Sequence, residues 1–117
     1  MYRLRSVLTR LGYHVVGTAR NGREAVESAS RLHPDLILMD VEMPELDGIS
    51  ATREIMRSHP TAILMLSAYS DHQTIRRALA AGASGNLVKP ATDAQLAAAV
   101  PAALERFQLE RELNGPS

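Results

Sequence analysis

Three polar residues in this chain stand where a predicted strand stops, and their side chains are of types that handle phosphate. They are Asp40 after the apolar run 36–39, Ser67 after the apolar run 62–66, and Lys89 after the brief strand 86–88. A carboxylate can act as a nucleophile and form an aspartyl phosphate, and an ammonium and a hydroxyl can stabilise the charge of that product. If the three side chains meet, the pattern predicts capture of a phosphoryl group. The plainer alternative is that Asp40 only ends a strand or caps a turn.

The elements that must position these residues follow from the apolar pattern. Short continuous apolar runs are typical of strands buried on both faces of a parallel sheet. Strands that alternate with helices predict an α/β fold with helices on both faces of the sheet, and the carboxyl ends of its strands form the ligand-binding edge. We expect strands at about 13–17, 36–40, 62–66 and 86–88, and helices at 4–11, from 23 to before Pro34, 48–58, around 75–81 and 92–107.

Local signals refine two of these elements. Thr92 and Gln95 have the spacing of a capping box at the start of the last helix. Pro101 falls inside that helix, so we expect a kink or a break near Ala97, because proline removes a hydrogen bond and its ring clashes with the preceding turn. Pro90 directly after Lys89 favours an unusual turn, in which a cis peptide bond is one option.

Size and composition exclude several classes of protein. The 117 residues predict one domain, and the absence of cysteine excludes disulfides and thiolate metal sites. Thirteen basic and thirteen acidic residues cancel, which argues against a domain that grips nucleic acid through its own charge. No apolar run approaches the roughly 20 residues needed to span a bilayer. We therefore expect a cytoplasmic protein with no nucleic-acid or membrane partner.

The chain resembles the receiver domain of bacterial two-component response regulators, from about Leu4 to Phe107. The motifs that carry this resemblance are, in order, Asp40 with Met43-Pro44 and Asp47-Gly48, Ser67-Ala68, Gly82-Ala83, and Leu87-Val88-Lys89-Pro90. The final helix and the residues after it also resemble, more weakly, receivers that lead into an RNA-binding antitermination (ANTAR) module. We therefore expect a receiver domain at residues 1–109, and a tail or the start of a linker to an output module at 110–117.

The resemblance implies a fold, a function and a set of roles. The fold is the flavodoxin-like (CheY-like) doubly wound parallel sheet. A histidine kinase or phosphotransfer protein phosphorylates Asp40, while Ser67 responds as the switch hydroxyl and Lys89 supplies the counter-charge. Asp40 and the backbone carbonyl of Glu42 help to hold Mg²⁺. Three residues have structural roles at the site: Pro44, Gly48 and Pro90. The resemblance implies a phosphoacceptor switch that is not a free-standing enzyme.

The chain departs from the family pattern at its start and at Asn86. A receiver normally opens with an apolar strand and two adjacent acidic residues, whereas this chain begins Met1-Tyr2-Arg3. The acidic pair normally completes the Mg²⁺ site, so the ligand set here is incomplete. Position 86 usually holds Tyr or Phe, and Asn cannot fill the space of a ring. A switch in this chain therefore has to work without that aromatic readout.

The missing strand has structural consequences, because in the family order 2-1-3-4-5 it lies in the middle of the sheet. Three explanations are open: the chain is a shortened form of a longer protein, the two flanking strands close up and pair directly, or a second copy pairs with the exposed strand edges. Two functions are also open. One is a phosphoacceptor switch, and the other is an inactive pseudo-receiver that acts as an interaction or dimerisation module. A homodimer through strand edges or the last helix fits either function.

Overall fold

The structure, a computed structural model, describes residues 2–68 and 71–114. Its elements are helix α1 (Tyr2–Arg10), helix α2 (Gly22–Leu32), strand β1 (Leu36–Asp40), helix α3 (Gly48–Ser58), strand β2 (Ala62–Ser67), helix α4 (His72–Ala81), strand β3 (Gly85–Val88) and helix α5 (Asp93–Asn114). The three strands are parallel and lie in the order β1-β2-β3. Within the described residues, no helix is long and apolar enough to cross a membrane.

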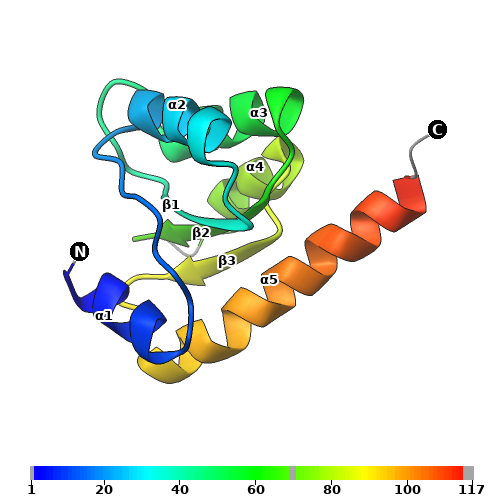
Figure 1. Cartoon of the computed structure of the whole chain (residues 1–117). Helices are drawn as coiled ribbons and strands as arrows, with labels where there is room; N and C mark the ends of the chain where they lie inside the picture. The colour runs from blue at the N-terminus through cyan, green and yellow to red at the C-terminus, as the bar shows by residue number, and fades with distance from the viewer. Residues whose placement is uncertain (1, 69–70, 115–117) are drawn as a thin grey trace.

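The sheet lies between two layers of helices (Figure 1). Helices α2, α3 and α4 cover one face and share a core with the β2 side chains Ile63 and Met65. Helices α1 and α5 cover the other face, where Leu64 and Leu66 of β2 meet their apolar side chains. Successive side chains of a strand point to opposite faces, so β2 needs apolar residues at every position. All six of its residues are buried, which explains the continuous apolar run in the sequence.

The helix ends are set by capping residues. Asn21, Asp47 and Asp71 each accept a hydrogen bond from a backbone N–H in the first turn of the helix that follows. The predicted capping box is present at the start of α5, where Gln95 N–H donates to Thr92 Oγ1 and Thr92 N–H donates to Gln95 Oε1. These short-range contacts fix where each helix begins relative to the sheet.

The predicted strand at 13–17 is wrong. Residues 13–17 have no regular secondary structure and connect α1 to α2. A strand exists only when its backbone groups pair with a neighbour, and within the described residues the sheet has three strands, with β1 at its edge. Direct pairing of this segment with β1, one of the three explanations left open by the sequence, is therefore absent from the structure.

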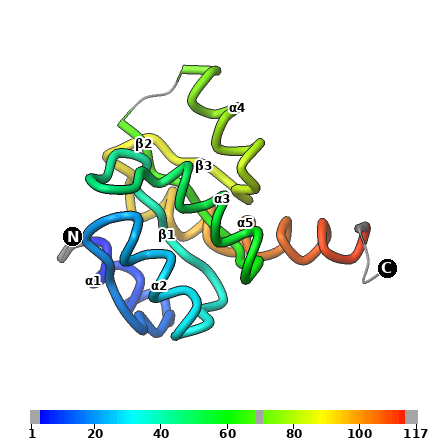
Figure 2. Tube along the Cα trace, turned by 90° about the horizontal axis from the view of Figure 1, so that it is seen from above, coloured from blue at the N-terminus to red at the C-terminus, as the bar shows by residue number. Residues whose placement is uncertain are grey.

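Of the kink or break predicted near Ala97, the break is wrong. Helix α5 runs without a break from Asp93 to Asn114 and contains Pro101. Val100 and Ala103 are buried against the sheet, whereas Pro101 is exposed, so contacts on the opposite face of the helix compensate for the hydrogen bond that proline lacks. The second half of α5 extends away from the rest of the molecule in both views (Figures 1 and 2).

Candidate functional site

The carboxyl ends of the three strands bring the three candidate residues to one edge of the sheet. Asp40 is the last residue of β1, Ser67 is the last residue of β2, and Lys89 directly follows β3. The backbone ladder continues past the strand ends, because Val41 N–H donates to Leu66 O at 2.8 Å and Lys89 N–H donates to Ser67 O at 2.8 Å. The hydrogen bonds of the sheet therefore place a carboxylate, a hydroxyl and an ammonium side by side.

Asp40 and Lys89 form a direct ion pair at this edge. The distance from Lys89 Nζ to Asp40 Oδ2 is 2.8 Å, and Asp40 Oδ1 accepts a hydrogen bond from Glu42 N–H at 2.9 Å. The side chains of Asp40 and Lys89 are 39% and 37% exposed. The Asp40 carboxylate is therefore held in a fixed orientation and remains accessible to a reagent from solvent.

The Glu42 side chain also belongs to the site, although the sequence pointed only to its backbone carbonyl. Its Oε2 accepts a hydrogen bond from Ser67 Oγ at 3.3 Å, and its Oε1 accepts one from Ala68 N–H at 3.1 Å. Lys89 Nζ lies 3.7 Å from Oε1. Glu42 thus connects the hydroxyl to the ammonium. No signal in the sequence revealed this, because the position two residues after Asp40 does not determine which way the side chain folds.

The loop between β1 and α3 carries the structural residues at the site. Leu46 N–H donates to Pro44 O at 2.7 Å, and Gly48 N–H donates to Val41 O at 3.0 Å, which closes the loop on itself. A Cβ atom at Gly48 would overlap the carbonyl oxygen of Asp40. Only glycine fits at this close approach, so Gly48 fixes the backbone from which the Asp40 side chain extends. The Lys89–Pro90 peptide bond on the far side of the site is cis.

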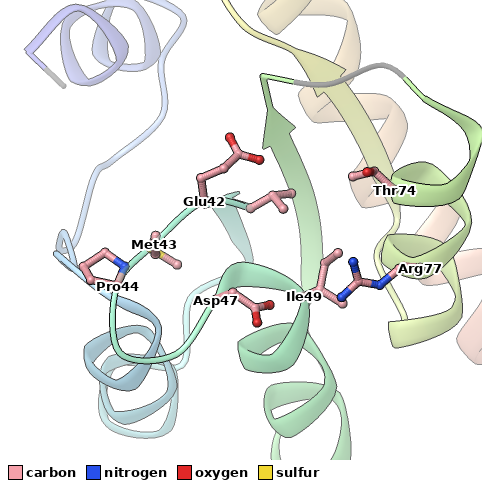
Figure 3. A pocket seen from close by; sticks show the side chains of 8 residues that line it. Glu42, Met43, Pro44, Asp47, Ile49, Thr74 and Arg77 are labelled. Atoms are coloured by element: carbon pink, nitrogen blue, oxygen red, sulfur yellow. The ribbon is translucent and has the colours of Figure 1, made fainter.

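A pocket of about 610 Å³ opens beside the loop (Figure 3). Glu42 and Met43 line it together with Asp47 at the start of α3 and Arg77 of α4, and Figure 3 shows Asp47 and Arg77 entering it from opposite sides. Burial would raise the pKa of Asp47, but hydrogen bonds from Ser50 and the nearby charge of Arg77 outweigh it and lower the pKa below its usual value. Asp47 therefore serves as an ionised helix cap.

Asn86 lies on β3, three residues before Lys89, at the position where the resemblance implied an aromatic residue. Its side-chain Oδ1 is buried and has no hydrogen-bond partner within the described part of the chain. A buried acceptor without a partner costs about 1–3 kcal/mol. Asn86 is thus a local liability for stability, and it provides no ring that could move with the site.

The side chains at this edge do not by themselves fit a magnesium ion. Mg²⁺ prefers an octahedral shell of oxygen ligands that includes carboxylates. Among the described residues, no group of three or more Asp, Glu, His or Cys side chains could hold a metal ion. Asp40 and Glu42 are the carboxylates at the strand ends, and both oxygens of each already accept a hydrogen bond from the protein.

Comparisons with known proteins agree with the geometry. Residues 1–101 match the model of a family described as the response regulator receiver domain. The transcriptional regulatory protein PdtaR of Mycobacterium tuberculosis is 42% identical over 112 residues, which cover 96% of this chain and 55% of PdtaR. The chemotaxis protein CheY of Thermotoga maritima is 46% identical over 88 residues, which cover 74% of this chain and 73% of CheY.

Longer relatives match this chain over only part of their own length. A protein-glutamate methylesterase of Alkalilimnicola ehrlichii is 54% identical over 84 residues, which cover 70% of this chain but 22% of that enzyme. The chain thus spans about a fifth of the methylesterase and about half of PdtaR. The methylesterase activity in the name of that relative therefore gives no grounds for assigning an activity to this chain.

Solved structures show the same fold. The receiver domain of the response regulator NarL from Mycobacterium tuberculosis is 30% identical and superposes with a TM-score of 0.84, covering 89% of this chain and 86% of that one. The receiver domain of the sensor histidine kinase PA1611 from Pseudomonas aeruginosa is 36% identical with a TM-score of 0.75, covering 91% and 85%. In that structure a magnesium ion is coordinated in the active site cleft.

Proposed function

The chain belongs to the response regulator receiver domain family, and on that basis we propose that it is a phosphoacceptor switch in which Asp40 takes a phosphoryl group from a histidine kinase or a phosphotransfer protein. In the transfer, the bond between phosphorus and the imidazole nitrogen of a phosphohistidine breaks and its electron pair returns to the nitrogen. A carboxylate oxygen of Asp40 forms the new bond to phosphorus.

The observation that carries this proposal is the ion pair between Asp40 and Lys89 at the end of the sheet. Its 2.8 Å distance keeps a cation next to the carboxylate that would take the phosphoryl group. Ser67, at the end of the neighbouring strand, is buried and directs its hydroxyl toward the same edge through Glu42. In the proposal Lys89 is the counter-charge, Ser67 is the switch hydroxyl, and Pro44, Gly48 and Pro90 hold the surrounding loops.

The poor set of metal ligands supports a second function. The described carboxylates make a poor magnesium site, whereas a family member carries magnesium in its cleft. A receiver fold that keeps Asp40 but binds magnesium weakly would serve as an inactive pseudo-receiver, that is, as an interaction or dimerisation module. Mg²⁺ binding by this chain, with Asp40 and the Glu42 carbonyl as partial ligands, therefore stays a prediction.

Phosphorylation from a small donor separates the two functions. The chain is incubated with acetyl phosphate over a range of MgCl₂ concentrations and weighed intact, beside an Asp40→Asn variant. A gain of about 80 Da, the mass of one phosphoryl group, that is absent from Asp40→Asn supports the switch. No gain at any magnesium concentration supports the inactive module. A gain that persists in Asp40→Asn places the acceptor elsewhere and contradicts the assignment of Asp40.

Two surfaces support the proposed homodimer. Within the described residues β1 is an edge strand, and edge strands offer unpaired backbone groups to another chain. The end of α5 exposes Leu109 and Leu113, at 50% and 85%. Residues 110–117 stay a proposed tail or linker, of which 115–117 lie outside the described residues, and the cytoplasmic location stays a prediction from the sequence.

A further inference from the structure

Three donors from two strand ends converge on a single carboxylate, that of Glu42. Ser67 Oγ donates to Oε2 at 3.3 Å, Ala68 N–H donates to Oε1 at 3.1 Å, and Lys89 Nζ lies 3.7 Å from Oε1. A hydroxyl, a backbone N–H and an ammonium that face one point form a site for an oxygen anion. In this structure the anion in that site is part of the protein itself.

The same donors are needed by the product of phosphorylation. Lys89 also lies 2.8 Å from Asp40 Oδ2, so a phosphoryl group on Asp40 would form next to the Glu42 carboxylate. Two oxygen anions cannot accept from the same hydroxyl and N–H at once. A phosphoryl group also carries about −1.5 to −2 charges at pH 7, and a neighbouring carboxylate repels it.

We propose that Glu42 is an internal competitor for the phosphoryl site: its carboxylate occupies the donors of Ser67, Ala68 and Lys89 and must leave before or during phosphorylation of Asp40. The inference rests on the proposed function, since it concerns the same site and reaction. Glu42 acts through the donors and is not bonded to the transferred group, so it is a positioning residue that slows the switch.

The structure allows the carboxylate to leave at small cost. The Glu42 side chain is 37% exposed, and ion pairs with this degree of exposure contribute little stability. Glu42 lies on the loop between β1 and α3 and lines the open pocket of about 610 Å³ beside it. A displaced carboxylate would therefore move into this open pocket without disturbing the buried core.

The first experiment measures phosphorylation by acetyl phosphate, an acyl phosphate, in the presence of MgCl₂. The bond between phosphorus and the acetate oxygen breaks, acetate leaves with the electron pair, and an Asp40 oxygen takes the phosphoryl group. We expect Glu42→Ala to gain mass about two- to fivefold faster than the native chain, the size of one partly exposed charge contact. Glu42→Gln, which loses the charge but keeps an acceptor oxygen, should lie in between. Glu27→Ala, which removes an exposed carboxylate from α2, should match the native chain.

An equal or lower rate in both Glu42 variants, with native folding shown by circular dichroism, contradicts the proposal. A second experiment does not depend on transfer of a phosphoryl group. In an Asp40→Asn background, inorganic phosphate is titrated while the amide signal of Ala68 is followed by ¹H–¹⁵N NMR. Phosphate should shift this signal at a lower concentration when Glu42 is also replaced by Ala. Equal titration with and without Glu42 overturns the competition, whereas absence of any mass gain in the first experiment overturns only the proposed function.

Discussion

The Lys89 ammonium lies 2.8 Å from Asp40 Oδ2, although 49 positions separate the two residues in the chain. The contact depends on parallel strands that end at one edge, because β1 and β3 have only β2 between them. The order and direction of the strands thus determine which charges meet at the site.

Replacing Lys89 by Met should reduce phosphorylation of Asp40 strongly and leave the fold intact. Within the described residues, the Lys89 ammonium is the cation that pairs with Asp40. Loss of a group that stabilises charge in the transition state lowers the rate by about 10²–10³-fold. Because the pair is partly exposed, its loss should change the free energy of unfolding by less than about 1 kcal/mol. The rate is measured by intact mass and the stability by urea denaturation. A Lys89→Met variant that reacts at the native rate would exclude Lys89 from the reaction.

Gly48→Ala should destabilise the chain by about 3 kcal/mol or prevent folding, because a new Cβ would overlap the Asp40 carbonyl and force the backbone apart. Gly12→Ala is the matched control. Gly12 has a φ of 96° and no atom within 4 Å of its ideal Cβ, so that variant tests backbone strain without a clash. Thermal denaturation should show the larger loss for Gly48→Ala. A smaller loss than in the control would mean that the loop can move away from β1.

The stability contributed by the Asp47 charge should depend on pH. The pKa of Asp47 is lowered in the folded chain, so its ionised form adds stability at pH values above the unfolded pKa of about 3.9, and this contribution is lost as the pH falls through the folded pKa. Asn keeps the capping acceptor but not the charge. At pH 7 we expect Asp47→Asn to unfold more easily by up to about 1 kcal/mol.

Urea denaturation of both proteins at several pH values checks this expectation. The difference between them should shrink toward zero below about pH 3. A difference that stays constant from pH 7 to that range would show that the carboxylate charge adds nothing and that only the acceptor oxygen matters.

Pro101→Ala should stabilise the chain. Pro101 has no N–H to donate to the carbonyl of Ala97, and both residues are exposed, so alanine can restore the hydrogen bond without filling a buried space. Proline inside a helix costs about 3 kcal/mol relative to alanine, and we expect part of that to be regained as a higher melting temperature. A lower melting temperature would indicate that the proline ring makes a stabilising contact.

Asn86→Val should also raise stability, by about 1 kcal/mol, because it removes a buried acceptor that has no partner in the described structure and places a β-branched residue in a strand. The acetyl phosphate reaction should be unchanged. Calorimetry tests the first expectation and intact mass the second. If the variant is less stable than the native chain, Asn86 has a partner such as bound water.

The sequence predicted the strands that end at Asp40 and Ser67 and the one before Lys89, because the first two are continuous apolar runs and the third is a short segment between a glycine and a proline. It failed at residues 13–17, where β-branched residues are present but the segment pairs with no strand of the described sheet. The break that it allowed near Pro101 does not occur, because packing of Val100 and Ala103 keeps the helix continuous. Strand pairing and helix packing are tertiary effects, and a local pattern does not contain them.

In the candidate site, too, some features could be predicted from the sequence and others could not. Strand ends bring Asp40 and Lys89 together, so their proximity followed from the topology. The roles assigned to them stay predictions until the transfer is measured. The role of the Glu42 side chain could not be predicted, because its hydrogen bonds to Ser67 and Ala68 depend on the conformation of a loop.

Helix α5 begins four residues after Lys89, at the edge that carries the ion pair, and its 22 residues span about 33 Å. Leu96, Val100 and Ala103 hold its first half against the sheet, so the second half is a rigid extension of the core. Its last turn lies about 16 Å along the helix axis from Ala103, which holds the exposed Leu109 and Leu113 clear of the domain, where another molecule can reach them.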